Sequence, residues 1–275
     1  MLKTRIITAL ILLFGLLAAL FLFPAVLWLA FCAAICGAAA WEWGTLARFQ
    51  SGLHIAFAVF AGAAALLLGL VAGLGEQGAS NPRALAPLYL ASAAFWVLAM
   101  PWWLARKWQI GSIASGVAVG LIVLLPATLA LAHLRQLGPW VLLAALSVAW
   151  VADIAAYFAG RAFGRHKLAP NISPGKTWEG AYGAAAGVVL FGILAVHASG
   201  LRPLSVTTLL TLIPLLLGLT AISVIGDLFE SLLKRQAGVK DSGNILPGHG
   251  GILDRIDSLT STLPLMGLAA LWLTR

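Results

Sequence analysis

Long apolar runs recur along the whole chain and constrain its fold more than any other feature. Each covers about 17 to 25 residues, the length that an α-helix needs to cross a bilayer. Nine such runs are present: 6–23, 25–41, 53–74, 84–104, 112–132, 138–159, 180–198, 205–228 and 258–274. The alternation typical of membrane β-strands is absent. With 61% hydrophobic residues, the chain is predicted to be an all-α polytopic membrane protein with about nine transmembrane helices.

The first two runs are joined almost without a loop at Pro24. Lys3 and Arg5 precede the first run as they would in a signal peptide, but no convincing cleavage site follows, so a retained helix is expected. If the two runs form one long or re-entrant element instead, the N-terminus changes sides while the later loops keep theirs.

Basic residues are divided unevenly between the two sides of the predicted bundle. With nine crossings and a cytoplasmic N-terminus, 13 of the 17 Lys and Arg residues lie on the inner side: Lys3, Arg5, Arg48, Arg106, Lys107, Arg161, Arg165, Lys167, Lys176, Lys234, Arg235, Lys240 and Arg255. The outer side holds Arg83, Arg135, Arg202 and Arg275. Short inner loops of membrane proteins carry such an excess, so the most polar loops are predicted to face the cytoplasm.

The net charge of +8 does not indicate binding to nucleic acid. The basic residues are spread over short loops and form no continuous stripe interleaved with aromatic residues. Anionic lipid headgroups and anionic soluble substrates are the better-motivated partners.

The first 150 residues offer few candidates for chemistry. Cys32 and Cys36 lie four apart in an apolar helix and are expected to be small buried side chains, not disulfide partners or metal ligands. Four polar residues fall near span edges, where solvated or interfacial placement is expected: Glu42, Glu76, His54 and His133.

Polar residues gather in the second half, in three blocks on the same predicted side: 153–179, 227–240 and 241–258. Their shared side indicates one composite site. We therefore predict a single integral membrane domain over 1–275, with N-terminal transmembrane helices in 1–150 and a catalytic half in 151–275 that contains the polar segment 231–258.

Asp153 lies inside an apolar run or at its inner end. A central carboxylate costs roughly 2.5–3.5 kcal/mol on insertion scales, so Asp153 needs a partner or a cavity. Tyr157 follows four residues later on the same helical face. A simple pairing of Asp153 with a neighbouring helix is the alternative.

The segment 160–180 is predicted to be a structured loop, because Pro170 and Pro174 prevent a continuous helix. A new helix should begin near Thr177. The free amides at its N-terminus, together with Lys176 and the nearby hydroxyls, would form an anion site. The spacing is not that of a P-loop, and a plain basic loop is an equally good interpretation.

Asp227, Ser231 and Lys234 are spaced i, i+4 and i+7 and therefore share one helical stripe, with Arg235 beside it. A carboxylate, a hydroxyl and a cation on one face suit a phosphate bridged by a metal ion. A snorkelling Lys–Arg pair alone would not account for Asp227, which lies deeper.

The last polar segment contains a predicted tight turn, 247–251, that exposes His249. Asp254 and Asp257 are three residues apart, so both can face one ion from the first helical turn. Helix capping is the alternative role for either carboxylate. His249 is interpreted as a ligand of phosphate or metal, or as a plain loop residue.

The segment 231–257 resembles the signature of the phosphatidate cytidylyltransferases, also called CDP-diacylglycerol synthases. The positions that carry the resemblance are Ser231-x-Leu233-Lys234-Arg235-x4-Lys240-Asp241-x-Gly243-x2-Leu246-Pro247-x-His249-Gly250-Gly251-Ile252-x-Asp254-Arg255-Ile256-Asp257. Two upstream motifs are similar to the same family: Asp153-x3-Tyr157-x2-Gly160-Arg161-x2-Gly164 and Ser173-Pro174-Gly175-Lys176-Thr177-Trp178-Glu179-Gly180.

The resemblance implies a nucleotidyltransferase of phospholipid biosynthesis that converts CTP and phosphatidic acid into CDP-diacylglycerol and pyrophosphate. It implies magnesium as cofactor, with or without a second cation, and a pocket that opens to the cytosol from a bacterial inner (plasma) membrane. The expected partners are CTP, phosphatidic acid and bilayer lipids, with no nucleic acid. A homodimer is compatible with the sequence, which does not fix the oligomeric state.

Both reactants are anionic, so catalysis is expected to depend on positioning and electrostatics and to need no protein nucleophile. The predicted metal ligands are Asp227 and Asp254, followed by Asp257 and Asp241. The cations assigned to the phosphates of CTP or to the departing pyrophosphate are Lys234, Arg235, Lys240 and Arg255. Lys176 and Ser173 are assigned to the nucleotide or the lipid headgroup, and Asp153 to orienting a cation or supporting a neighbouring ligand. The remaining predicted substrate-binding residues are Thr177, Ser231, His249 and Tyr157.

Two other functions compete with this interpretation. The first is another membrane enzyme that uses CTP, such as a polyprenol kinase or an archaeal-type lipid cytidylyltransferase. Transfer of the γ-phosphoryl group would release CDP, whereas cytidylyl transfer releases pyrophosphate. A transporter with Asp153 and Asp227 as coupling site is the second, and it would need inverted repeats in both halves. The polar residues here lie in one half and one leaflet.

Overall fold

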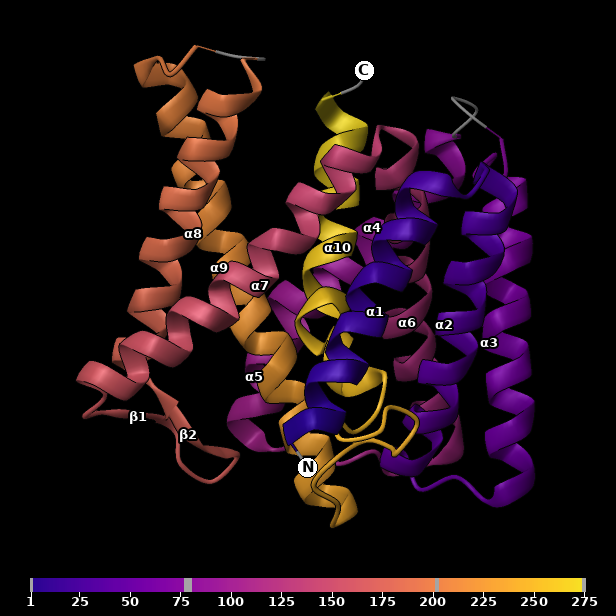
Figure 1. Ribbon diagram of the computed structural model, residues 1–275. Coiled ribbons are helices and arrows are strands. Elements are labelled where there is room, and N and C mark those ends of the chain that lie inside the picture. The colour runs from indigo at the N-terminus through magenta and orange to yellow at the C-terminus, as the bar shows by residue number, and fades with distance from the viewer. Residues whose placement is uncertain (1, 77–80, 201–202, 274–275) are drawn as a thin grey trace.

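The computed structural model describes residues 2–76, 81–200 and 203–273, and Figure 1 shows their arrangement as a bundle of long helices. The first half contains α1 (Leu2–Leu22), α2 (Ala25–Leu46), α3 (Ser51–Val71), α4 (Pro82–Ala94), the π-helix η1 (Phe95–Ala99), α5 (Met100–Arg106) and α6 (Ile113–Gln136). The second half contains α7 (Pro139–Phe163), β1 (Lys167–Ala169), β2 (Ser173–Thr177), α8 (Trp178–Ser199), α9 (Val206–Ala237) and α10 (Leu253–Leu273).

All nine predicted apolar runs are helical, with α4, η1 and α5 forming one span. Within the described residues, 7 helices are long and apolar enough to cross a membrane; α1 and α10 are the two runs outside that set. The polytopic all-α prediction is confirmed. The last helix, α10, begins at Leu253, five residues before the apolar run that starts at 258, and the predicted place of Asp254 and Asp257 at its start is confirmed.

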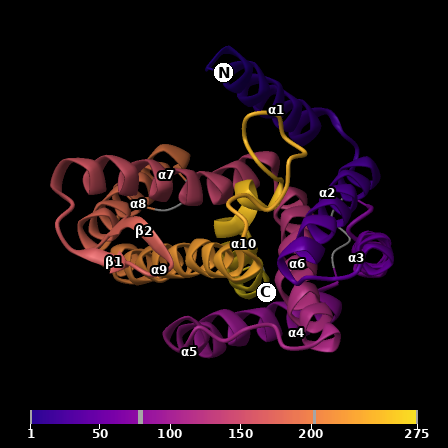
Figure 2. The same ribbon diagram turned by 90° about the horizontal axis from the view of Figure 1, so that it is seen from below.

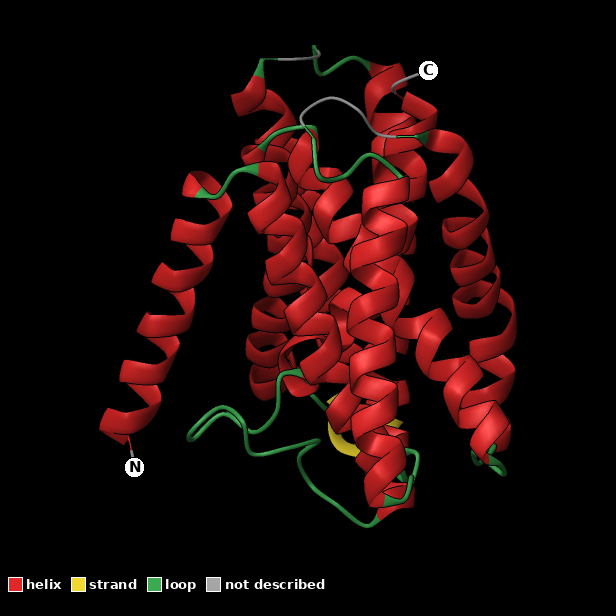
Figure 3. Cartoon of the chain, turned by 90° about the vertical axis from the view of Figure 1, so that its right-hand side faces the viewer, coloured by secondary structure: helices red, strands yellow, loops and turns green. Residues whose placement is uncertain are grey.

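The turn at Pro24 separates α1 from α2, so the alternative of one long element is wrong. Arg135 of α6 holds this turn: its Nε donates to the Leu20 carbonyl at 2.9 Å and its Nη2 to the Phe23 carbonyl at 2.7 Å. These carbonyls end α1 and lack partners within the helix. From this anchor, α1 diverges from the other helices toward its N-terminal end (Figure 3).

The N-terminal end of α1, the β1–β2 hairpin and the α9–α10 loop lie at one end of the bundle, and the C-terminal end of α10 lies at the other (Figure 1). This arrangement agrees with nine crossings. Among the charges that favoured this topology, the side chains of Lys3 and Arg5 and all of Arg202 and Arg275 lie outside the described residues. With 32 residues, α9 extends about 48 Å. Its last turns therefore project beyond a hydrocarbon core of about 30 Å.

Seen from below, α10 lies between the group α7, α8, α9 and the group α2, α3, α4, α6 (Figure 2). It packs against α6 and α4 on one side and against α9 on the other. Aromatic rings add a second junction: Trp103 and Trp96 each lie 5.7 Å from the Phe229 ring of α9. Both halves of the sequence therefore meet around the polar end of α9.

The α7–α8 pair is held close by small residues. Gly160 of α7 faces Gly180 of α8, and a Cβ added to Gly180 would lie 3.0 Å from the Ala156 carbonyl oxygen. Membrane helices approach closely where such small residues meet. The connection between them, predicted as a structured loop, is an antiparallel hairpin in which Lys167 pairs with Thr177. The helix start near Thr177 is confirmed, because its side chain accepts a hydrogen bond from Gly180 N at 3.1 Å and caps α8.

The structure corrects two expectations in the first half. Glu42 and His133 are each only 1% exposed, so their predicted interfacial placement is wrong. His133 stacks on Tyr89 with ring centroids 6.0 Å apart. Cys32 and Cys36 are buried and free, as predicted.

Candidate functional site

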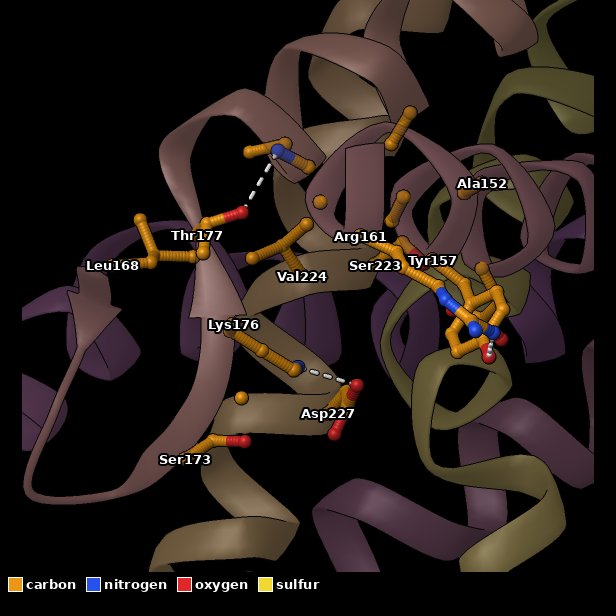
Figure 4. Close-up of a pocket in the computed structure, with 17 residues that line it drawn as sticks. Ala152, Tyr157, Arg161, Leu168, Ser173, Lys176, Thr177, Ser223, Val224 and Asp227 are labelled. Carbon is orange, nitrogen blue, oxygen red and sulfur yellow. Dashed lines mark hydrogen bonds and ion pairs between the residues drawn. The ribbon is translucent and has the colours of Figure 1, made fainter. Parts of the chain in front are cut away.

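A pocket of about 520 Å³ lies between α7, the hairpin, α8 and α9, at the polar end of the bundle (Figure 4). Six residues predicted from the sequence line it: Asp153, Tyr157, Ser173, Lys176, Thr177 and Asp227. Two of the three predicted polar blocks, 153–179 and 227–240, therefore line one cavity, whereas the block 241–258 contributes none of its lining residues.

The pocket has a polar side and an apolar side. The polar groups come from one face of α7, from β2 and from α9, as the spacing of Asp153 and Tyr157 predicted. The apolar wall is made of small side chains on α7 and α8: Ala152, Ala156, Gly160, Gly180, Ala181 and Ala184. The close packing of these two helices thus leaves a smooth wall that continues into the membrane-spanning part.

Lys176 and Asp227 form an ion pair across the pocket (Figure 4). Their side chains are 23% and 28% exposed, so the pair is partly shielded from water. Ser231 Oγ donates to Asp227 Oδ1 at 3.3 Å, which confirms that these two residues share a helical face. The Asp227 carboxylate is therefore held by a cation from β2 and a hydroxyl from its own helix.

Other carboxylates gather around Asp227. Asp153 is exposed and makes no hydrogen bond or ion pair with the described part of the chain, yet it lies close enough to Asp227 and Lys176 to interact electrostatically. Asp257 of α10 interacts with both Asp227 and Asp153. A close helix contact brings Asp257 there, since a Cβ on Gly226 would lie 3.0 Å from the Asp257 carbonyl oxygen.

Asp254 belongs to a second cluster, next to the pocket. Its Oδ1 accepts from Lys234 Nζ at 2.6 Å, and its Oδ2 accepts from Ser242 N at 2.8 Å, Ser242 Oγ at 3.0 Å and Gly251 N at 2.9 Å. Lys234 also donates to Glu230 Oε2 at 3.1 Å. Asp254 thus uses both oxygens to fasten the loop that joins α9 to α10 (residues 238–252, the signature loop) to α9.

The predicted tight turn is confirmed, with His249 N donating to the Leu246 carbonyl at 2.9 Å. Gly248 and Gly250 have φ angles of 77° and 82°, which residues other than glycine rarely adopt. Arg255 donates to the His249 carbonyl through Nε at 3.1 Å and Nη2 at 2.8 Å. His249 itself is half-buried and not fully exposed as predicted.

Arg235, Lys240 and Asp241 are exposed, and Arg235 Nε donates to the Ile172 carbonyl at 3.5 Å in the hairpin turn. Among the described residues, nine of the predicted site residues do not line the pocket: Ser231, Lys234, Arg235, Lys240, Asp241, His249, Asp254, Arg255 and Asp257. The described part of the chain holds no ready-made group of three or more metal-ligating side chains. The four-carboxylate metal assignment stays a prediction.

Three residues were missed by the sequence reasoning. Arg161 lines the pocket and its Nη1 donates to the Tyr157 hydroxyl at 2.9 Å. Glu230 is buried beside Lys234, and the i, i+4 spacing of the pair was the signal available. Glu42 is buried against the signature loop. Glu42 follows directly after the predicted run 25–41, and α2 continues past it to Leu46. A carboxylate so close to an apolar run is a functional candidate, which was the signal available for Glu42.

Comparison with known proteins extends over almost the whole chain. Residues 3–272 match the cytidylyltransferase family. A phosphatidate cytidylyltransferase of Pseudomonas aeruginosa is 39% identical over 278 residues, which cover 99% of this chain and 97% of that protein. One of Haemophilus influenzae is 34% identical over 279 residues, with 96% of each chain covered. One of Bacillus subtilis is 44% identical over 134 residues, about half of each chain.

Proposed function

Because this chain belongs to the cytidylyltransferase family and is similar to phosphatidate cytidylyltransferases over nearly its full length, we infer that it transfers the cytidylyl group of CTP to phosphatidic acid. The products are CDP-diacylglycerol and pyrophosphate, and the reaction serves phospholipid biosynthesis. We propose that it takes place in the pocket between α7, β2, α8 and α9. The supporting observation is the pairing of Lys176 with Asp227 opposite an apolar wall of small residues.

The reaction needs the phosphate of a lipid to attack the α-phosphorus of CTP, so two anions must approach one another. Lys176 and Arg161 are the cations that line the pocket, and the hydroxyls of Ser173 and Tyr157 lie beside them. Preorganised donors of this kind stabilise charge on transferring oxygens. The small-residue wall of α7 and α8 suits the apolar part of a lipid whose headgroup lies at the polar side.

The Lys176–Asp227 pair has a direct consequence for binding. Phosphate oxygens that reach Lys176 compete with Asp227 for its ammonium group, because both are anionic acceptors. The Asp227 carboxylate would then be released toward a cation. Charge balance in the pocket thus links nucleotide binding to the exposure of a carboxylate.

The donor set fits a divalent cation, which the family chemistry implies. Asp153, Asp227 and Asp257 repel one another, and hard oxygen donors at such a site suit magnesium. We propose Mg²⁺ held first by Asp227, with Asp153 or Asp257, and a second cation at the same group. Magnesium takes one or two carboxylates and completes its shell with phosphates and water. When bound, it would neutralise charge on the phosphates.

The signature segment supplies further proposed contacts. Asp254 and Asp241 rank lower as metal ligands, because Asp254 already accepts four hydrogen bonds and Asp241 is exposed outside the pocket lining. Lys234, Arg235, Lys240 and Arg255 are assigned to the phosphates of CTP or to pyrophosphate, and Thr177, Ser231 and His249 to supporting substrate contacts. The proposed setting is a single domain, 1–275, alone or as a homodimer, in a bacterial inner membrane with the pocket facing the cytoplasm.

One assay tests the proposed function. Purified protein in detergent is given labelled CTP and phosphatidic acid, with and without magnesium, and both products are identified. We expect a liponucleotide and pyrophosphate in equal amounts, formed only with the metal. Release of CDP with a phosphorylated lipid would point to a kinase instead, and absence of any product with a folded protein would contradict the assignment.

A further inference from the structure

We propose that Glu42, which lies on α2 and outside the signature, is a positioning residue for the reaction. Its carboxylate holds the signature loop, 238–252, and the first turn of α10 in the arrangement that the reacting groups require. This inference rests on the proposed function, because it assigns a role within the same site. It does not make Glu42 a catalytic residue.

Glu42 accepts two backbone hydrogen bonds, and a third from a hydroxyl that it shares with Asp254, all from residues at least 200 positions away in the sequence. Oε1 accepts from Ile252 N at 3.0 Å, and Oε2 accepts from Leu253 N at 2.8 Å and from Ser242 Oγ at 3.0 Å. The two amides belong to the start of α10, where unpaired N–H groups and the helix dipole favour an anion. Glu42 therefore caps α10 from another helix.

Burial makes this contact specific. The Glu42 side chain is 1% exposed, and no cation pairs with it among the described residues. A buried carboxylate without its donors is strongly unfavourable, so displacing the loop from Glu42 would be costly. The loop and α2 thus depend on one another.

Two fixed glycines of the signature adjoin this carboxylate. A Cβ on Gly243 would lie 2.5 Å from Glu42 Oε1, and a Cβ on Gly251 would overlap Glu42 Oε2. The backbone conformation does not require glycine at either position, since neither residue has a positive φ angle. The space for Glu42 is therefore the physical reason for glycine at position 243, and the space for Glu42 and Ser242 together is the reason at position 251. Both glycines place Glu42 in the same unit as the signature.

A short chain of contacts connects Glu42 to the reacting groups. Ser242 Oγ is shared between Glu42 Oε2 and Asp254 Oδ2, each at 3.0 Å, and Asp254 Oδ1 accepts from Lys234. The first turns of α10 also carry Asp257, which interacts electrostatically with Asp227. A shift of α10 would move these carboxylates relative to Asp227, and small misplacements in a site cost as much as 10²-fold in rate.

The experiment compares wild-type protein with Glu42→Gln and with Glu76→Gln, the same chemical change at an exposed residue distant from the signature loop. The first measurement is limited trypsin digestion in detergent, as the ratio of cleavage after Lys240 in the loop to cleavage after Lys167 in the hairpin. Loss of hydrogen bonds to a charged group should raise this ratio about tenfold in Glu42→Gln. The ratio should not change in Glu76→Gln.

The second measurement is steady-state kinetics against CTP and magnesium. Glu42→Gln should lower kcat by about 10- to 100-fold and raise the magnesium concentration for half-maximal rate, whereas Glu76→Gln should match wild type. Simple loss of folded protein would reduce the rate without moving the magnesium requirement and would speed cleavage at both sites. Should Glu42→Gln not fold, Ser242→Ala, which removes the hydroxyl that joins Glu42 to Asp254, must show the same two changes at smaller size.

The possible failures are distinguishable. Inactive wild-type protein with the expected cleavage ratios would contradict the proposed function and leave the loop contact standing. Active wild-type protein with an unchanged cleavage ratio in Glu42→Gln, or with kcat within about twofold of wild type, overturns the positioning role.

Discussion

Replacing Asp227 with Asn separates the chemical role of the Lys176–Asp227 pair from its structural role. The change removes the negative charge but keeps an oxygen that can accept from Ser231 Oγ. Lys176 loses its anionic partner, and the proposed cation loses its first ligand. Both losses change the charge balance of one pocket, so the free energy of the transition state should rise strongly and the rate should fall.

The cost to stability follows from the exposure of the pair. Two unit charges 4 Å apart interact by about 4 kcal/mol at an effective dielectric constant near 20. Both side chains are about one quarter exposed, so solvent screening reduces the net contribution to about 1–2 kcal/mol. The melting temperature should therefore fall by only a few degrees. Loss of one preorganised electrostatic contact typically costs about 10²–10³ in kcat, or roughly 2.7–4 kcal/mol.

The assay measures labelled CDP-diacylglycerol formed from CTP and phosphatidic acid, together with the melting temperature in the same detergent. Glu76→Gln is the matched control, because it makes the same carboxylate-to-amide change at an exposed residue outside the site. We expect a rate loss of at least about 100-fold for Asp227→Asn and none for the control. Retention of more than about a tenth of wild-type activity would refute the reasoning.

Three further expectations follow from the same contacts. Arg161→Ala removes the donor to the Tyr157 hydroxyl and one of two pocket cations, so KM for CTP or phosphatidic acid should rise about tenfold; unchanged constants for both substrates would contradict this. Gly251→Ala places a methyl group against Ser242 and Glu42 and should lower the free energy of unfolding by about 1–3 kcal/mol. Thermal unfolding measures the change, with Gly175→Ala as the control because the space around Gly175 is open. Chelation of divalent ions should abolish turnover, and magnesium should restore it more effectively than calcium, whose larger shell fits the site less well; full activity in chelator would be inconsistent with the metal proposal.

Asp153, Lys176 and Asp227 show how far local spacing reaches. Each was identified from its own segment, and the pocket brings all three together. Their common side of the membrane followed from the alternation of apolar runs. The hairpin β1–β2 was not predicted, because its three- and five-residue strands carry no alternating pattern.

Asp254 and Glu42 show where local spacing stops. From its position three residues before Asp257, Asp254 was interpreted as a metal ligand, yet four hydrogen bonds now engage it. Three of these come from Ser242 and Gly251, whose approach depends on how the loop folds back. Glu42 was expected at an interface, although it is buried against that same loop.

The sequence alone determined the helical spans, the alternating direction of successive spans and the types of polar residue that collect at one end of the bundle. Those properties depend on hydropathy and helical period, which act over tens of residues at most. Only the tertiary structure decided which carboxylates face the pocket and which hold the loop, since that depends on contacts such as Glu42 with Leu253, 211 residues apart. No periodic sequence pattern connects a donor and an acceptor so far apart in the chain. Their pairing follows from the packing of α2, α9 and α10.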